Sequence, residues 1–269
     1  MKKLLVISLI SLVATAYAWT QRAPNPPQAC QVHAPYGFPL TTGTQLICRQ
    51  AYLVGYDPVA KIPRYVTYEL TPPNALGCVA RTNAFATDQS VKNGATPDDY
   101  AGTGYDKGHM SPDGDLSWDP QVEYESFLMT NMVPQAGSLN RGIWKLLETS
   151  VRGWAVQHNQ SYTIYVGAVY NAQDKKIGAG VIVPHGFYKI VINNQTNETA
   201  GWAFPHTAPY PNLGNDLTRF RLPISQIQQA AGVQFAFPPS AQELNPGQEW
   251  PVDFGKLTQT KRAKCGRSD

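Results

Sequence analysis

Short runs of β-branched and aromatic residues recur in two stretches of this chain, and each run is bounded by turn-forming residues. Such runs predict strands of a sheet. The expected strands cover residues 46–48, 52–56 and 65–70 in the first stretch, and 162–169, 187–192 and 199–204 in the second. Because no change in composition separates the two stretches, we expect one α+β domain with a central, mostly antiparallel sheet flanked by helices.

An apolar stripe at helical spacing lies between the two sets of strands. Its members are Leu139, Ile143, Leu146, Leu147 and Val151. This spacing predicts a helix over residues 139–157, with Ser138 as its N-cap. Residues 126–133, just before it, have the composition of a buried strand that ends at Pro134.

The remaining segments give weaker patterns. Residues 71–104 are expected to be mostly loop, and a long loop that leads into a candidate site favours a functional role. A short helix is expected over residues 222–232. Residues 235–269 are expected to form a tail.

The first eighteen residues have the pattern of a secretory signal peptide. Lys2 and Lys3 precede an apolar run over residues 4–14, and the small residues Ala16 and Ala18 mark a cleavage site. An uncleaved membrane anchor is the alternative, but the run is shorter than the roughly 20 residues that span a bilayer. We therefore expect a secreted or periplasmic protein without stable membrane association after cleavage.

After the signal peptide we expect two parts. Proline is frequent over residues 19–45, which predicts an irregular N-terminal arm. Residues 46–269 are expected to form a single domain that ends in a basic tail.

Four cysteines follow the predicted cleavage site. An even number of cysteines in an exported protein favours two disulfides, and three connectivities are possible. We favour Cys30–Cys48 with Cys78–Cys265, because this pairing closes one local loop and secures the tail. The spacings do not match a zinc site.

The net charge says little about an acidic partner. The whole chain carries +3, and loss of Lys2 and Lys3 leaves +1 (3 − 2). Basic residues gather near the C-terminal end: Lys256, Lys261, Arg262, Lys264 and Arg267. Such a tail could help to hold phosphates, although a solvated basic tail is the more common explanation.

The candidate chemistry centres on the tetrapeptide Asp106-Lys107-Gly108-His109. A single histidine is more often structural than catalytic. Here Gly108 allows a close approach to the backbone, and Asp106 or another carboxylate could orient the ring. A neutral imidazole near pH 7 is suited to accepting a proton from water.

Asn140 and Glu148 form the second candidate element. Eight positions along a helix turn the side chain by about 80°, so the two lie on neighbouring faces. Mg²⁺ keeps several waters and needs only one or two protein oxygens, which this pair could supply. Alternatively, Asn140 is a first-turn residue and Glu148 pairs with Arg152 four positions later.

Four segments in this order resemble the secreted, non-specific DNA/RNA endonucleases with a ββα-metal (His-Me finger) site, the group that includes endonuclease G. The tetrapeptide resembles their Asp-Arg-Gly-His signature. The other matching segments are Thr130-Asn131-Met132-Val133-Pro134-Gln135, Leu139-Asn140-Arg141-Gly142-Ile143-Trp144 with Leu147-Glu148, and Pro184-His185-Gly186-Phe187-Tyr188-Lys189. The resemblance extends over residues 52–232 and implies a ββα-metal nuclease core.

The resemblance also implies roles for single residues. His109 would be the general base, Asn140 the one direct ligand of Mg²⁺ (for which Mn²⁺ can substitute), and Glu148 the holder of a metal-bound water.

The resemblance implies further that Arg81 and Arg152 bind phosphate and that Asn131 supports the site. Lys107 stands where the family has arginine. Lysine keeps the charge but loses the bidentate fork, so we expect this position to differ from that in relatives.

These observations predict an exported, Mg²⁺-dependent endonuclease that cleaves phosphodiester bonds of DNA and RNA with little sequence preference. One alternative is a nucleic-acid-binding protein of the same fold that has lost catalysis. Another is a disulfide-bonded structural or adhesion protein. The sequence leaves the oligomeric state and any inhibitor protein open.

Overall fold

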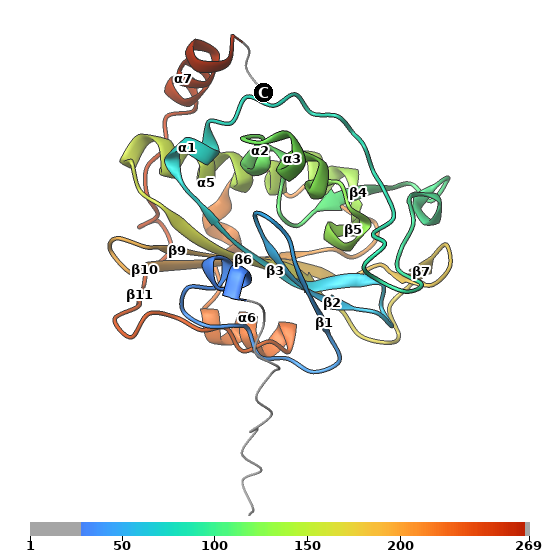
Figure 1. Cartoon of the computed structure of the whole chain (residues 1–269). Helices are drawn as coiled ribbons and strands as arrows, with labels where there is room; N and C mark the ends of the chain where they lie inside the picture. The colour runs from blue at the N-terminus through green and yellow to red at the C-terminus, as the bar shows by residue number, and fades with distance from the viewer. Residues whose placement is uncertain (1–27, 267–269) are drawn as a thin grey trace, which may run out of the picture.

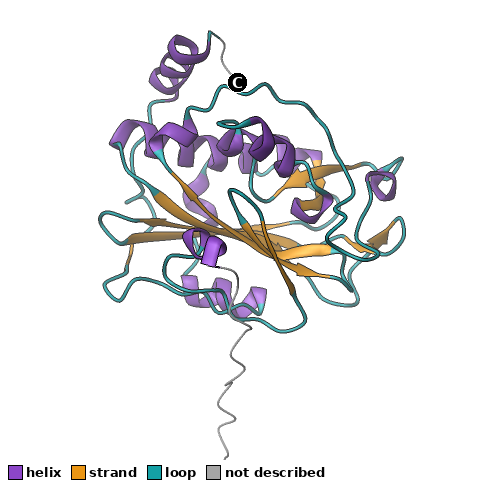
Figure 2. Ribbon diagram, in the orientation of Figure 1, coloured by secondary structure: helices purple, strands orange, loops and turns teal. Residues whose placement is uncertain are grey.

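A twisted sheet lies at the centre of the molecule, with helices on both of its faces (Figures 1 and 2). The computed structural model describes residues 28–266, and within them seven strands form this sheet in the order β1-β2-β3-β6-β9-β10-β11. Their bounds are β1 Gln45–Cys48, β2 Leu53–Asp57, β3 Ile62–Leu70, β6 Tyr162–Val169, β9 Gly186–Asn193, β10 Glu198–Pro205 and β11 Gln242–Glu243. All neighbours are antiparallel except β10 and β11, so the expected fold class and all six expected strands are confirmed.

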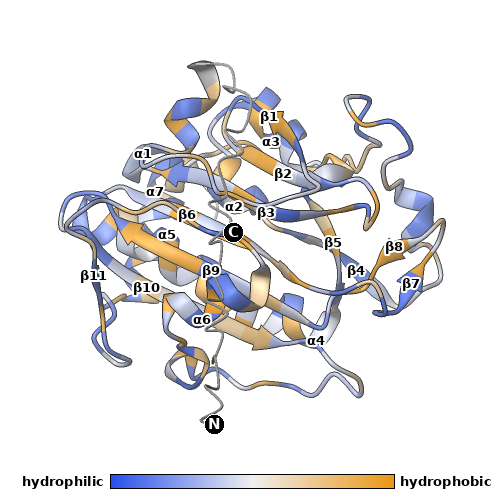
Figure 3. Ribbon diagram, turned by 90° about the horizontal axis from the view of Figure 1, so that it is seen from below, coloured by the Kyte–Doolittle hydropathy of each residue, from blue (hydrophilic) through white to orange (hydrophobic). Residues whose placement is uncertain are grey.

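The central strands are apolar because both faces of the sheet are covered. All eight residues of β9 are buried. Below the sheet in Figure 1 lies α6 (Ile224–Ala231), which confirms the short helix expected there. In Figure 3 several strands of the sheet are coloured as hydrophobic, whereas the loops at the rim are mostly hydrophilic. This burial explains why runs of β-branched and aromatic residues located the strands correctly.

The helix expected over residues 139–157 is present, but its first turns are irregular. It consists of α4 (Gly137–Leu139), a π-helical turn η4 (Asn140–Trp144) and α5 (Lys145–His158). Gly142 has non-helical dihedral angles inside the π-turn, φ −101° and ψ −120°. Ser138 is not the N-cap as expected. Its hydroxyl donates instead to the backbone oxygen of Tyr210.

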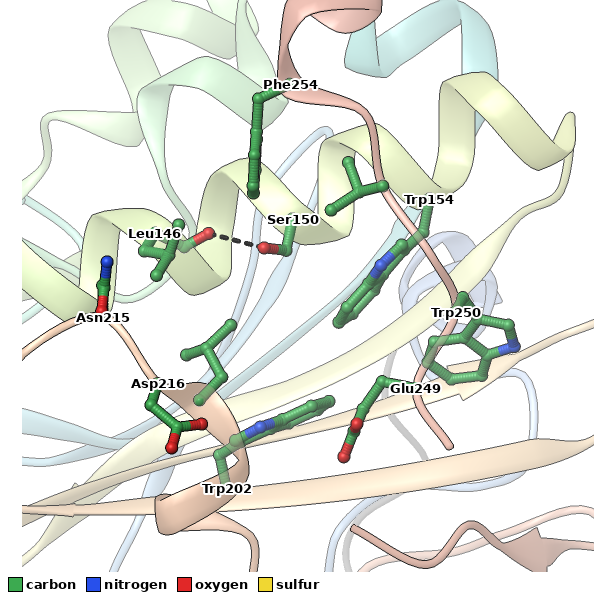
Figure 4. A pocket seen from close by; sticks show the side chains of 11 residues that line it. Leu146, Ser150, Trp154, Trp202, Asn215, Asp216, Glu249, Trp250 and Phe254 are labelled. Atoms are coloured by element: carbon green, nitrogen blue, oxygen red, sulfur yellow. Dashed lines mark hydrogen bonds between the residues drawn. The ribbon is translucent and has the colours of Figure 1, made fainter. Parts of the chain in front are cut away.

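Helix α5 packs on the sheet through its aromatic residues. Trp154 stacks on Trp202 of β10, with ring centroids 5.8 Å apart. Figure 4 shows both indoles at a pocket of about 540 Å³ between α5, β10 and the segment before α7. Leu146 and Ser150 of α5 also line this pocket, two turns and one turn before Trp154, respectively.

A two-stranded ribbon, β4 (Tyr105–His109) with β5 (Met132–Ala136), stands beside the sheet. It corrects the strand expected over residues 126–133. That segment is the end of α3 (Pro120–Ser126) and a 3₁₀ turn, η3 (Met129–Asn131), and the strand begins later. The strand also continues through Pro134, which a ribbon tolerates because a proline there can turn its missing N–H to the open edge.

Residues 71–104 are mostly loop, as expected. The remaining elements are η1 (Gln28–His33), α1 (Pro72–Ala75), η2 (Pro97–Tyr100), α2 (Asp113–Leu116), β7 (Lys176–Ile177), β8 (Val181–Ile182), η5 (Leu217–Phe220) and α7 (Phe254–Cys265). Helix α7 corrects the expectation that residues 235–269 are only a tail. It begins at Asp253, whose carboxylate accepts from the amide of Lys256.

Two disulfides, Cys30–Cys48 and Cys78–Cys265, confirm the favoured pairing, with Cα–Cα distances of 5.6 Å and 5.3 Å. The second joins α7 to the loop after α1. The predicted signal peptide, residues 19–27 of the expected arm and Arg267 lie outside the described residues. Among residues 28–266, none of the helices has the length and apolar character needed to cross a membrane.

Candidate active site

A cavity of about 490 Å³ opens where the ribbon β4–β5 meets the helix that follows β5. It contains six of the seven predicted site residues, namely Arg81, Lys107, His109, Asn140, Glu148 and Arg152. The exception is Asn131. The loop that carries Arg81, strand β4 and the helix after β5 thus bring together residues up to 71 positions apart in the sequence (152 − 81).

His109, the last residue of β4, is 8% exposed. The ring of Phe127 meets the imidazole edge-on, with centroids 4.9 Å apart, and Nε2 has no hydrogen-bond partner among the described residues. Burial, together with the positive charge of Arg81, lowers the pKa of His109 to about 3. The imidazole is therefore neutral at physiological pH and keeps a lone pair for a proton.

Asp106 does not orient His109, so that expectation is wrong. Side chains three positions apart on a strand point to opposite faces. The carboxylate of Asp106 accepts instead from Nδ2 of Asn140 at 2.9 Å, and Nε of Arg141 lies 3.4 Å from the same oxygen. Since the amide nitrogen of Asn140 is committed to Asp106, its amide oxygen is the end left to accept from, or coordinate, a ligand.

Glu148 has a buried cationic neighbour that the sequence analysis missed. Nζ of Lys189, on the central strand β9, lies 3.9 Å from Oε1 of Glu148 and 4.9 Å from the ring centre of Trp144. Lys189 is 1% exposed. Burial raises the pKa of Glu148 to about 7, although the charges of Lys189 and Arg152 oppose this shift. The sequence signal that could have identified Lys189 is its place as the one charged residue inside the apolar run 187–192.

Arg152 is buried on the same helix. Its NH1 donates to Oδ1 of Asp115 at 2.8 Å, and its NH2 donates to the hydroxyl of Thr149 at 3.1 Å. Asp115 is 1% exposed and also accepts from the hydroxyl of Tyr68 at 2.7 Å. Asp115 therefore holds Arg152 at the wall of the cavity, and sequence reasoning did not single it out.

The other two predicted cations, Arg81 and Lys107, are more exposed. Arg81 stands over the ring of Phe127 at 4.8 Å, and its NH1 donates to Oδ2 of Asp113 at 3.2 Å. Nζ of Lys107 lies 5.0 Å from the ring centre of Phe85. Lys107 and His109 are two positions apart on β4, so both side chains point to the same face.

Asn131 is fully buried and does not line the cavity. Its Nδ2 donates to the backbone oxygens of Ser111 and Ser126, both at 2.8 Å, and its Oδ1 accepts from the amide of Ser111 at 2.9 Å. The side chain thus braces the turn that follows His109 against the end of α3.

The oxygen donors at this cavity suit a hard divalent cation. The amide oxygen of Asn140 and the carboxylate of Glu148 are ligands of the kind that Mg²⁺ prefers, with water completing its shell. Among residues 28–266 there is no group of three or more His, Cys, Asp or Glu side chains that could hold a metal ion.

Comparison with known proteins identifies the family. Residues 31–242 match the family described as DNA/RNA non-specific endonuclease. The chain belongs to this family. It is therefore a nuclease that hydrolyses phosphodiester bonds.

Named relatives of this nuclease come from distant organisms. Human mitochondrial endonuclease G is 29% identical over 221 residues, which cover 75% of this chain and 72% of that protein. A nuclease of Nostoc sp. is 27% identical over 208 residues, which cover 73% and 74% of the two chains. A crystal structure of the EndoG/EndoGI complex matches with a TM-score of 0.67 and 25% identity, covering 79% of this chain and 93% of that chain.

Proposed function

We propose that this nuclease is an exported, Mg²⁺-dependent endonuclease that cleaves both DNA and RNA, with His109 as general base. The observation that carries the proposal is a neutral, buried imidazole in one cavity with the oxygen donors Asn140 and Glu148. A catalytically lost nucleic-acid-binding protein would have no need to keep this combination.

Different residues of the cavity bind the phosphate and accept the proton. Arg81 and Arg152 bind phosphate oxygens, because guanidinium groups match their geometry. His109 accepts a proton from the attacking water, whose oxygen bonds to phosphorus while the bond to the 3′ oxygen breaks. The leaving 3′ oxygen takes a proton from solvent water, and the products are a 5′-phosphate and a 3′-hydroxyl.

Asn140 and Glu148 would hold the metal through their side-chain oxygens. When bound, Mg²⁺ supplies stabilisation of the negative charge that develops on the phosphate and the leaving oxygen. Asp106 fixes the amide of Asn140, and Lys189 offsets the charge of Glu148. Contacts to the phosphate backbone carry no direct sequence information, so little sequence preference is expected.

Export is part of the proposal. The two disulfides support an oxidising compartment, and the first eighteen residues have the pattern of a signal peptide. We therefore assign the protein to the periplasm or the extracellular space.

The test is cleavage of supercoiled plasmid and of single-stranded RNA by the purified protein with Mg²⁺, and again with EDTA. We expect His109→Ala to abolish nearly all cleavage of both substrates while DNA binding and the melting temperature stay close to those of the parent protein. The matched control is His158→Ala, since His158 lies at the far end of α5 and contacts Pro251. DNA retarded in a gel but left uncut with every divalent metal would establish the binding protein instead.

A further inference from the structure

Helix α2 places two aspartates between the two candidate phosphate-binding arginines. Asp113 and Asp115 are two positions apart on this four-residue helix. Asp113 pairs with Arg81, and Asp115 pairs with Arg152. The two pairs differ in burial and in the number of contacts that hold them.

The pair of Asp115 and Arg152 is a fixed part of the fold. The side chains are 0% and 9% exposed, and the hydroxyl of Tyr68 holds the other carboxylate oxygen. Breaking a buried pair of this kind leaves an uncompensated charge. Asp115 thus positions Arg152 permanently.

The pair of Asp113 and Arg81 is open to the cavity. The side chain of Arg81 is 45% exposed and that of Asp113 is 14% exposed, and a single contact of 3.2 Å joins them. Both residues line the cavity that contains His109. An incoming anion can therefore reach the guanidinium that Asp113 contacts.

Arg81 does not depend on Asp113 for its position. Its Nε donates to Oδ1 of Asn83 at 2.8 Å, and its guanidinium rests on the ring of Phe127. These two contacts use one donor and one face of the guanidinium. Asp113 uses NH1, a donor that a phosphate oxygen would otherwise take, since carboxylate and phosphate oxygens are interchangeable partners of arginine.

We infer that Asp113 occupies the place of a substrate phosphate on Arg81 and thereby weakens nucleic-acid binding. The substrate must displace the carboxylate to reach Arg81. The inference rests on the proposed function, because it takes Arg81 as a phosphate ligand. It predicts that removal of the charge of Asp113 strengthens binding, the opposite of the usual effect of changing a residue inside a binding cavity.

The experiment measures the Kd of a labelled 20-base-pair duplex by fluorescence anisotropy at pH 8 with EDTA, so that binding is observed whether or not the protein cleaves. Exposed ion pairs contribute little, so we expect Asp113→Asn to lower the Kd by about two- to fivefold. Asp113→Ser serves as a second variant, and melting curves verify that both fold. The matched control is Asp98→Asn, which removes the same charge at an exposed position that does not line the cavity.

A double-mutant cycle decides whether the effect acts through Arg81. In an Arg81→Gln background, Asp113→Asn should change the Kd no more than Asp98→Asn does. If Asp113→Asn lowers the Kd even in the Arg81→Gln background, Asp113 weakens binding only through its general repulsion of the nucleic-acid phosphates. A higher Kd for Asp113→Asn in the parent protein would instead make Asp113 a residue that positions Arg81, and would overturn the inference. Absence of cleavage with Mg²⁺ would count against the proposed function but not against this inference, because the double-mutant cycle measures binding in EDTA and does not depend on cleavage.

Discussion

Gly114 lies between Asp113 and Asp115, and the absence of a side chain there lets Arg152 approach α2. A Cβ built on Gly114 would lie 2.8 Å from NH1 and 3.0 Å from Cζ of Arg152. Arginine side chains usually give way to such a contact, but Asp115 and Thr149 both hold this guanidinium. The position of Arg152 in the cavity therefore depends on the absence of a side chain at Gly114.

We expect Gly114→Ala to displace the guanidinium of Arg152 and to lower cleavage of plasmid DNA by roughly tenfold or more, because small misplacements of binding groups are costly in catalysis. Initial rates at saturating Mg²⁺ measure this effect. Gly94→Ala is the control, since its Cβ would meet Val91 at no less than 3.3 Å and lies away from the cavity. An unchanged rate for Gly114→Ala would show that Arg152 has room to move.

At the level of residues, the sequence predicted the candidate site residues that belong to short local motifs. His109, Asn140 and Glu148 stand in short matching segments, and the structure brings them to one cavity. Asp113 lies outside the matching segments, and Lys189 ends the last of them, but the sequence assigned a role to neither residue. Their importance arises from contacts with Arg81 and Glu148, which lie 32 and 41 positions away in the chain (113 − 81 and 189 − 148).

At the level of elements, strand prediction succeeded where burial was uniform. The strands of the central sheet are covered on both faces, so their composition alone marks them. The helices α2 and α3 have four and seven residues, which is too short to display a helical period. Strand β5 was placed too early because Pro134 was taken as its end.

His206 joins the segment after β10 to the start of the helix that carries Asn140. Its Nε2 accepts from the amide of Ala136 at 2.8 Å, and its Nδ1 donates to the oxygen of Pro184 at 2.7 Å. Only the neutral imidazole with its proton on Nδ1 can make both bonds. Burial lowers the pKa of His206 below 6.5, although the bond to Pro184 opposes this shift.

A lowered pKa in the folded state means that the unfolded chain binds the proton more tightly. This contribution to stability is therefore complete above pH 6.5 and is lost as the pH falls through the folded-state pKa. We expect the melting temperature of the parent protein to decrease more, relative to that of His206→Gln, between pH 7 and pH 5. Protonation of Glu148, whose pKa burial raises to about 7, contributes to both proteins with the opposite sign. His33 and His109 are also buried with lowered pKa values and contribute in the same direction as His206, so His33→Gln and His109→Gln are measured in parallel. Equal pH dependence in the parent and His206→Gln would exclude His206 as a cause.

At the level of the whole molecule, the two disulfides close loops of very different length. Cys30 and Cys48 are 18 residues apart, whereas Cys78 and Cys265 are 187 apart. In the chain-entropy account, a longer loop restricts the unfolded chain more. The long link also joins α7 to Cys78, which lies three residues before Arg81 in the loop after α1.

We expect Cys78→Ser with Cys265→Ser to lower the free energy of unfolding by roughly 2 kcal/mol more than Cys30→Ser with Cys48→Ser does. Urea titrations of the two double variants, at equal protein concentration, measure the difference. If removal of Cys30–Cys48 lowers the free energy of unfolding more, the packing of this disulfide against Ala34 and Leu53, and not the length of its loop, determines its contribution to stability.

The Cys78–Cys265 disulfide can form only late in the synthesis of the chain. The ribosome must add nearly two hundred residues after Cys78 before its partner exists, so the segment that carries Arg81 is unanchored during most of synthesis. In a reducing cytosol the bond would not form even then. Under the export proposed above, the bond between Cys78 and Cys265 would therefore form only after the chain has left the reducing compartment.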